Sequence, residues 1–199
     1  MNILDAKQSY GAQIKSYYAK QTELSAQKKE LDQKIRTTEN GATVFQNEAA
    51  VLELQMGAVD AKRQEYQDYM DKLSEQWAGV VNVVSSEQQG DAMADAAKEE
   101  AKVMEVARRI MKGDRVPAYD EQKLMEYDWK LYSAAKNIAS MLELQKKRKE
   151  HKSLWEDEEE KEYEDPADVA NNTEAFADGP EMVDVDVTVS EAVASANEE

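Results

Sequence analysis

The sequence predicts an all-α protein: an elongated antiparallel coiled-coil hairpin over residues 8–84, two further amphipathic helices, and a disordered acidic C-terminal tail. Three observations support this fold class. Apolar residues recur every seven positions along two segments, the turn-forming pair Asn40-Gly41 separates those segments, and most of the net negative charge lies at the C-terminal end. The expected organisation is a helical body over residues 1–164 followed by the tail over residues 165–199.

The more regular of the two heptad repeats runs from Phe45 to Val84. One core column contains Phe45, Leu52, Val59, Tyr66, Leu73 and Val80, and the second contains Ala49, Met56, Arg63, Met70, Trp77 and Val84. Only a long helix with a continuous apolar seam needs this pattern, because the two columns then stay on one side of the helix. The seam therefore requires a partner helix.

A weaker heptad precedes it and supplies that partner. Its apolar residues are Tyr10, Ile14, Tyr17, Leu24, Leu31 and Ile35. Asn40-Gly41 reverses the chain between the two, since both residues tolerate positive φ. At a 1.5 Å rise per residue the second helix spans roughly 60 Å and the first roughly 45 Å. The unpaired end of the second helix is expected to be covered by the C-terminal helices or by a second subunit, which makes Leu73, Trp77, Val80 and Val84 candidate partner-binding residues.

Two more helices are expected at about residues 91–112 and 120–160. The polar segment Ser85–Asp91 would separate the first of them from the hairpin. The expected apolar face of that helix contains Met93, Ala96, Ala97, Ala101, Met104, Ala107 and Ile110. Gly113 is expected to end it, and Asp120 or Asp128 to cap the next helix. Arg115 and Tyr119 in the connecting loop form a candidate docking point, although helix-ending roles account for the loop without one.

The negative charge is concentrated in the C-terminal part. Residues 156–199 contain 17 acidic side chains and one Lys, whereas residues 1–155 contain 25 acidic and 24 basic ones. Low apolar content predicts disorder beyond Asp165-Pro166. Within this tail Val183, Val185, Val187 and Val189 alternate with polar residues. This alternation is typical of a strand that adds to the edge of a partner's sheet, and an idle tail is the alternative.

The composition excludes several kinds of chemistry. The chain has no Cys and one His, so it has no Cys or Cys/His zinc site, disulfide or thiol nucleophile. His151 lies in the polar run Lys146–Lys152, which is typical of a solvated helix face. The sequence lacks the glycine motifs that cradle phosphate and the spacing of a calcium loop. We therefore expect no enzymatic activity, no cofactor and no metal ion.

The N-terminal residues lack the apolar core of a signal peptide, and no stretch approaches the roughly 20 apolar residues of a membrane span. We expect a cytoplasmic protein that does not enter a membrane, with leaderless export as the alternative. The acidic tail would repel a phosphate backbone, so we expect no nucleic-acid partner.

One segment carries a family resemblance. Arg108-Arg109-Ile110, Gly113-Asp114, Val116-Pro117, Asp120-Glu121 and Lys123–Tyr127 resemble a segment of uncharacterised helical proteins of anaerobic Firmicutes, over about residues 107–142. The resemblance implies a bacterial source and no activity. Trp77-Ala78-Gly79 invites comparison with the secreted WXG family, but here Trp77 occupies a core heptad position and the seam continues to Val84.

These observations predict a non-enzymatic protein–protein interaction protein: a coiled-coil adaptor, scaffold or chaperone-like protein. It would bind a protein partner, or associate with itself as a homodimer, through the helical seam. The first alternative is a leaderless helical protein exported by a specialised secretion system. The second is a carboxylate-bridged metal enzyme, but the Glu-x-x-His motif of di-iron bundles does not occur.

Overall fold

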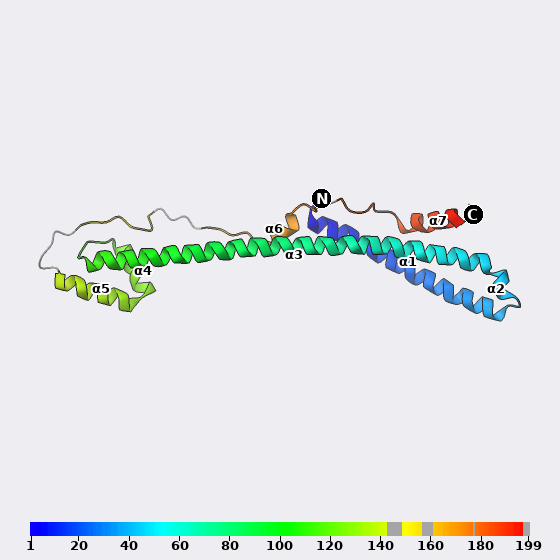
Figure 1. Cartoon of the computed structure of the whole chain (residues 1–199), viewed down its shortest axis with the longest axis horizontal. Coiled ribbons are helices and arrows are strands. Elements are labelled where there is room, and N and C mark those ends of the chain that lie inside the picture. Colours follow the sequence, from blue (N-terminus) through cyan, green and yellow to red (C-terminus); the bar gives the residue numbers. More distant parts are fainter. Residues whose placement is uncertain (143–148, 157–160, 177, 197–199) are drawn as a thin grey trace. The chain divides into compact units, whose positions relative to one another are not determined.

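The computed structural model describes residues 1–142, 149–156, 161–176 and 178–196. Their regular secondary structure is helical, which confirms the all-α class. The helices are α1 (Ile3–Thr37), α2 (Gly41–Val44), α3 (Gln46–Met111), α4 (Ala118–Tyr127), α5 (Trp129–Leu142), α6 (Pro166–Asn172) and α7 (Val185–Ala196) (Figure 1). The chain forms two compact units: the hairpin unit, Met1–Val84 with Asp165–Glu199, and the α4–α5 unit, Ser85–Glu164.

The connection between α1 and α3 is a tight reversal. Asn40 adopts the left-handed region at φ 57°, which asparagine tolerates better than most residues. Gly41 is buried against α1, where a Cβ atom would lie 2.9 Å from Ile35 Cα. The chain reversal expected at Asn40-Gly41 is therefore confirmed.

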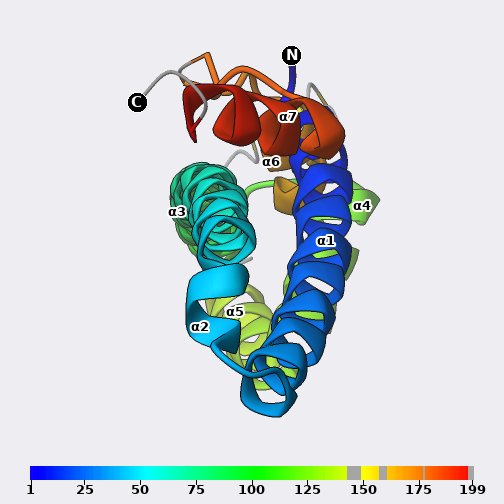
Figure 2. The ribbon, with the colours of Figure 1, turned by 90° about the vertical axis from the view of Figure 1, so that its right-hand side faces the viewer.

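α1 and the N-terminal part of α3 run antiparallel. Lys28 pairs with Glu53 at 3.2 Å, and Gln21 pairs with Asp60 at 3.3 Å. Residues earlier in α1 thus contact residues later in α3, as in an antiparallel pair. Their shared core contains Ala6, Tyr10, Ile14, Tyr17, Leu24, Leu31, Leu52, Val59, Tyr66, Tyr69 and Leu73. All but Ala6 and Tyr69 are apolar residues of the two expected heptad repeats. Figure 2 shows the two helices side by side with α7 across them.

α3 is one continuous helix of 66 residues, so the break expected at Ser85–Asp91 and a separate helix at 91–112 are wrong. Most of these polar side chains are exposed, and an exposed polar side chain does not interrupt a helix that is packed elsewhere along its length. The expected apolar face is also largely wrong, since Met93 is 77% and Met104 is 48% exposed. The buried residues are Val103, Val106, Ala107 and Ile110.

Gly113 ends α3 as expected. It has φ 78°, its N–H donates to the Ile110 carbonyl at 2.8 Å, and the Asp114 N–H donates to the Arg109 carbonyl at 3.1 Å. This pair of hydrogen bonds is a Schellman motif, which satisfies the last carbonyls of the helix.

The single helix expected over residues 120–160 is wrong. α4 ends at Tyr127, and Asp128 caps α5 by accepting from the Lys130 N–H at 2.8 Å. Residues 149–156 are not helical; instead the Arg115 N–H donates to the Lys149 carbonyl at 2.7 Å. Part of the basic run Lys146–Lys152 lies outside the described residues.

Asp120 does not cap α4 but lies inside the α4–α5 unit. Its side chain is 0% exposed, and its carboxylate accepts from Ser153 Oγ at 2.6 Å and from the Leu154 N–H at 3.2 Å. The neighbouring Trp155 is buried, and its indole N–H donates to Glu99 at 2.7 Å. A buried carboxylate therefore holds the segment 149–156 on this unit.

The expectation of a disordered tail is wrong for its described residues, which include α6 and α7. Asp165 caps α6 by accepting from the Ala167 N–H at 2.8 Å, with Pro166 in the first turn. The expected valine strand is also wrong, because Val185–Ala196 is a helix. Val185 and Val189, four residues apart, pack against the hairpin core, and Ala192 on the same helical face is buried. A short valine run therefore fits a helix as well as a strand.

We expect Asp120→Ala to lower the free energy of unfolding by about 1–3 kcal/mol, because it leaves the partly buried Ser153 hydroxyl and Leu154 N–H without their acceptor. Urea unfolding followed by circular dichroism measures the change. The control is Glu126→Ala on the exposed surface of the same helix, which should change stability by less than about 0.5 kcal/mol. Equal stabilities of the two variants would contradict the structural role of Asp120.

Candidate functional site

Four tyrosines pack together between α1 and α3 and form what we call the tyrosine cluster: Tyr10, Tyr17, Tyr66 and Tyr69. The Tyr10 and Tyr69 ring centroids are 4.7 Å apart, and those of Tyr17 and Tyr66 are 5.4 Å apart, both edge to face. All four residues are buried. The rings are therefore fixed by one another and by the two helices that carry them.

The hydroxyls of the cluster bind the main chain of the C-terminal segment. Tyr10 donates to the Pro180 carbonyl at 2.7 Å, Tyr66 to the Glu181 carbonyl at 3.0 Å, and Tyr17 to the Val183 carbonyl at 3.0 Å. Tyr66 also accepts from the Val183 N–H at 2.8 Å. Residues 180–183 thus lie along the hairpin as a peptide held through its backbone.

Gly179 fits against the rings of two of these tyrosines. A Cβ atom at this position would overlap the Tyr10 hydroxyl and would lie 2.7 Å from Tyr69 Cε1. Tyr10 is 3% exposed and packed against Tyr66 and Tyr69, so its ring has no free space to move into. The surface accepts glycine here and excludes larger residues.

α7 continues the contact beyond the extended stretch. Val185 and Val189 pack against the hairpin core, whereas Val187 is 44% exposed on the outer side. Thr188 Oγ1 lies 2.6 Å from the Tyr17 hydroxyl, and Asp186 lies 3.8 Å from Lys20 Nζ. Of the four valines singled out in the sequence, Val183 contributes its backbone and Val185 and Val189 contribute their side chains.

The apolar end of the seam is covered by α6, which lies in the segment expected to be disordered and is neither of the two helices expected to cover it. Trp77 Nε1 donates to Asn171 Oδ1 at 2.9 Å, and Lys7 Nζ lies 5.1 Å from the Trp77 ring centroid. The Ile3 N–H donates to the Thr173 carbonyl at 2.9 Å. Leu73 is fully buried here. Val80 and Val84, further along α3, are half-buried.

Arg115 and Tyr119 belong to the α4–α5 unit and not to the tyrosine cluster. The Arg115 guanidinium pairs with Glu150 at 2.9 Å. The Tyr119 ring meets Trp155 edge to face at 6.3 Å. Both side chains contact the segment 149–156, which gives them a structural role in this unit.

Burial raises the pKa of three tyrosines of the cluster, Tyr10, Tyr17 and Tyr69, and so favours their neutral form. Burial raises the pKa of Tyr17 to about 12, although its hydrogen bond with Thr188 acts in the opposite direction. Burial also raises the pKa of Tyr10 and Tyr69, and negative charge on Asp178 adds to both shifts. The hydroxyls of Tyr10, Tyr17 and Tyr69 therefore remain neutral throughout the physiological range.

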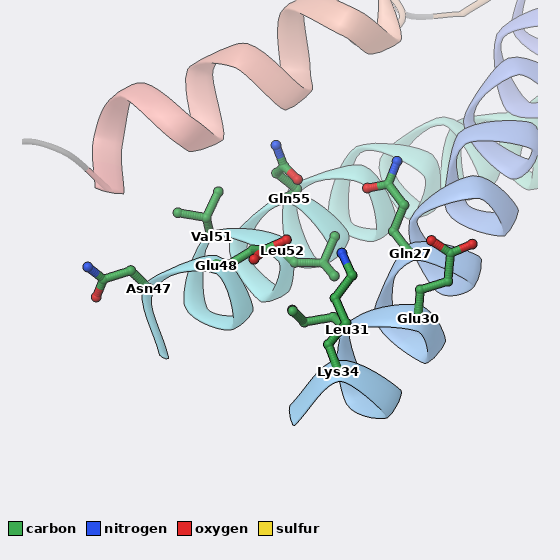
Figure 3. A pocket seen from close by; sticks show the side chains of 9 residues that line it. All are labelled: Gln27, Glu30, Leu31, Lys34, Asn47, Glu48, Val51, Leu52 and Gln55. Carbon is green, nitrogen blue, oxygen red and sulfur yellow. The ribbon is translucent and has the colours of Figure 1, made fainter. Parts of the chain in front are cut away.

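An open groove of about 400 Å³ lies between α1 and α3 close to α2 (Figure 3). Its lining residues are Gln27, Glu30, Leu31, Lys34, Asn47, Glu48, Val51, Leu52 and Gln55. Leu31 and Leu52 belong to the hairpin core, and most of the remaining side chains are polar. This groove is an open continuation of the helix interface with no buried polar side chain among its lining residues.

Among the described residues, no group of three His, Asp or Glu side chains is placed to hold a metal ion. No described helix is both long and apolar enough to cross a bilayer. Comparisons with protein-family models, with curated proteins and with solved structures find no match for this chain.

The heptads placed Tyr10, Tyr17 and Tyr66 in the core but did not indicate that their hydroxyls bind the C-terminal segment. The available signal was chemical: a tyrosine at a core heptad position buries a hydroxyl that needs a partner. Tyr69 lies outside the apolar heptad positions, and Gly179 and Pro180 fall in the tail expected to be disordered.

The raised tyrosine pKa values predict alkaline sensitivity. The folded state favours the neutral phenol, so the contribution of Tyr17 is complete below pH 10, the ordinary tyrosine pKa, and is lost as pH rises towards about 12. A spectrophotometric titration should show that Tyr10, Tyr17 and Tyr69 ionise after the exposed tyrosines, with circular dichroism reporting the fold. Tyr17→Phe should remove one late-ionising group. Simultaneous ionisation of all tyrosines in the folded protein would contradict the burial of the cluster.

Proposed function

We propose that this chain is a non-enzymatic protein-binding protein of the adaptor, scaffold or chaperone-like kind, in which the hairpin unit binds an extended peptide segment. The observation that carries the proposal is the tyrosine cluster. Three of its hydroxyls hold the carbonyls of Pro180, Glu181 and Val183. The same hairpin surface thus has the chemistry of a peptide-binding site.

The geometry suits recognition of a peptide backbone. Carbonyl groups are common to all peptides, so donors aimed at them contribute affinity without demanding particular side chains. The donors are pre-positioned because their rings are packed between two helices, which reduces the ordering entropy lost on binding. Buried aromatic anchors of this kind are typical of the residues that dominate protein interfaces.

The same features disfavour catalysis. A phenol whose pKa is raised above its ordinary value is a weak base and a weak nucleophile at neutral pH. The single histidine, His151, lies in the α4–α5 unit, 3.1 Å from Asp114 Oδ2. We therefore propose an interaction role that needs neither a cofactor nor a metal ion.

Charge favours an acidic protein partner segment over nucleic acid. Lys20 Nζ lies 3.0 Å from Glu23 of its own helix and 3.8 Å from Asp186 of the bound stretch. Lys62 pairs with Glu65 at 2.7 Å, and the charge of Glu181 in the bound stretch acts on it more weakly. Basic side chains beside this surface would attract carboxylates on a bound peptide, whereas the acidic C-terminal segment repels a phosphate backbone. We propose that the protein acts in the cytoplasm, with self-association as the alternative to a different partner.

Peptide selection tests the proposal. A displayed library of random peptides is selected on the full-length chain carrying Gly179→Leu, whose leucine overlaps Tyr10 and Tyr69 and so vacates the surface. We expect selected peptides to bind at least about tenfold more weakly when Tyr10, Tyr17 and Tyr66 are also changed to Phe, since each lost hydrogen bond costs about 0.5–1.5 kcal/mol.

The Phe substitutions keep the ring packing and remove only the hydroxyls, so they serve as the matched control for the site. Thermal unfolding verifies that both variants remain folded. The proposal fails if no peptide is enriched, or if the enriched peptides bind equally well with and without the hydroxyls.

A further inference from the structure

We infer that residues 178–192 are an intramolecular ligand that occupies the peptide-binding surface and must be displaced by a partner of the same chemical class. That class is an acidic segment with a glycine, an extended stretch, and then a helix with apolar residues four positions apart. The inference rests on the proposed function, because it takes the hairpin surface to be a peptide-binding site.

The glycine is the element that selects among peptides. Backbone hydrogen bonds are available to any sequence, but the space over Tyr10 and Tyr69 admits no Cβ atom. Specificity that arises from steric exclusion is a form of discrimination against wrong partners. A competing segment therefore needs glycine at the position that Gly179 occupies.

The second element is the helix that follows the extended stretch. Val185 and Val189 face the hairpin core and Ala192 is 9% exposed, whereas Val187 points outwards. The contact thus uses one narrow apolar stripe of a helix of 12 residues. A helix of this length is marginal in isolation, so α7 depends on docking for its stability.

The docked segment is anchored separately from α6. α6 and its flanks are held by the hydrogen bond from Trp77 to Asn171 at 2.9 Å and by the one from Ile3 to Thr173 at 2.9 Å. None of these contacts involves residues 178–192. The segment can leave the tyrosine cluster while α6 continues to cover Leu73 and Trp77.

The tether gives the chain's own segment an advantage over a free peptide. Because α6 stays in place, residues 178–192 act at an effective concentration in the millimolar range, as expected for a short linker. A free peptide with a dissociation constant of tens of micromolar would then bind the occupied surface about 10- to 100-fold more weakly than the vacant one. Occupation from within the chain thereby sets an affinity threshold for partners.

The test measures binding of a fluorescein-labelled synthetic peptide with the sequence of residues 174–196 to full-length protein by fluorescence anisotropy. We expect Gly179→Leu to bind the probe about 10- to 100-fold more tightly than the unchanged chain. The control is Gly57→Ala in α3, where a Cβ atom meets nothing within 4 Å, and it should bind like the unchanged chain. A probe with leucine in place of its own glycine should not bind any of them.

A second full-length variant, Val189→Asp, keeps the inference testable if Gly179→Leu does not fold, since it places a charge on the packed stripe of α7 and should also increase probe binding. Equal binding by the unchanged chain and the folded variants would overturn the inference but leave the proposed function intact. A third result is that the folded variants fail to bind the probe and yet select peptides whose binding needs the tyrosine hydroxyls. That result would overturn the assigned ligand class, a glycine-containing acidic segment followed by a helix. Absence of both would overturn the proposed function as well.

Discussion

The hydroxyls of the tyrosines buried between α1 and α3 are the constraint on which the hairpin unit depends. Large aromatic rings at core positions bury much apolar area, but each brings a polar atom that is costly to leave unpaired. The backbone carbonyls of α1 and α3 already accept hydrogen bonds within their own helices. The acceptors for the tyrosine hydroxyls therefore come from a third element. Residues 180–183 supply them, with three carbonyls within 3.0 Å of three hydroxyls. Polar satisfaction of the hairpin thus explains the order of a segment whose own composition favours disorder.

In the α4–α5 unit a buried polar side chain likewise holds a distant segment, but here the buried side chain accepts the hydrogen bonds and the segment donates them. Buried Asp120 needs donors, and Ser153 and the Leu154 N–H provide them from a non-helical segment far along the chain. Trp155 next to them adds apolar area to the core and finds its own acceptor in Glu99. In both units a returning segment with little helical or strand character is held by a few buried polar groups, so the order of such segments is set by the helices they cover.

This dependence explains which features could be predicted from the sequence. The heptads identified the buried faces of α1 and of α3 as far as Val84. Local backbone chemistry identified the reversal at Asn40-Gly41, the end of α3 at Gly113, and Asp128 as one of two candidate caps. Each of these follows from residues close together in the chain. The continuity of α3 through Ser85–Asp91, the docking of residues 178–192 and the burial of Asp120 depend on contacts between distant residues. Periodicity and propensity contain no information about such contacts, which is why α7 resembled a strand and the C-terminal segment resembled a disordered tail.

Under the proposed function, the tyrosine hydroxyls and the site of Gly179 make different contributions to the choice of a partner. Hydroxyls that bind carbonyls provide affinity that is nearly independent of sequence, so on their own they would make the hairpin a promiscuous surface. The space over Tyr10 and Tyr69 removes most sequences by steric exclusion, and Lys20, which lies near Asp186 of α7, favours acidic ones. A resident segment that meets all of these criteria then blocks weak competitors, because tethering raises its effective concentration. Selectivity on this surface therefore follows from exclusion and competition more than from the strength of any single contact.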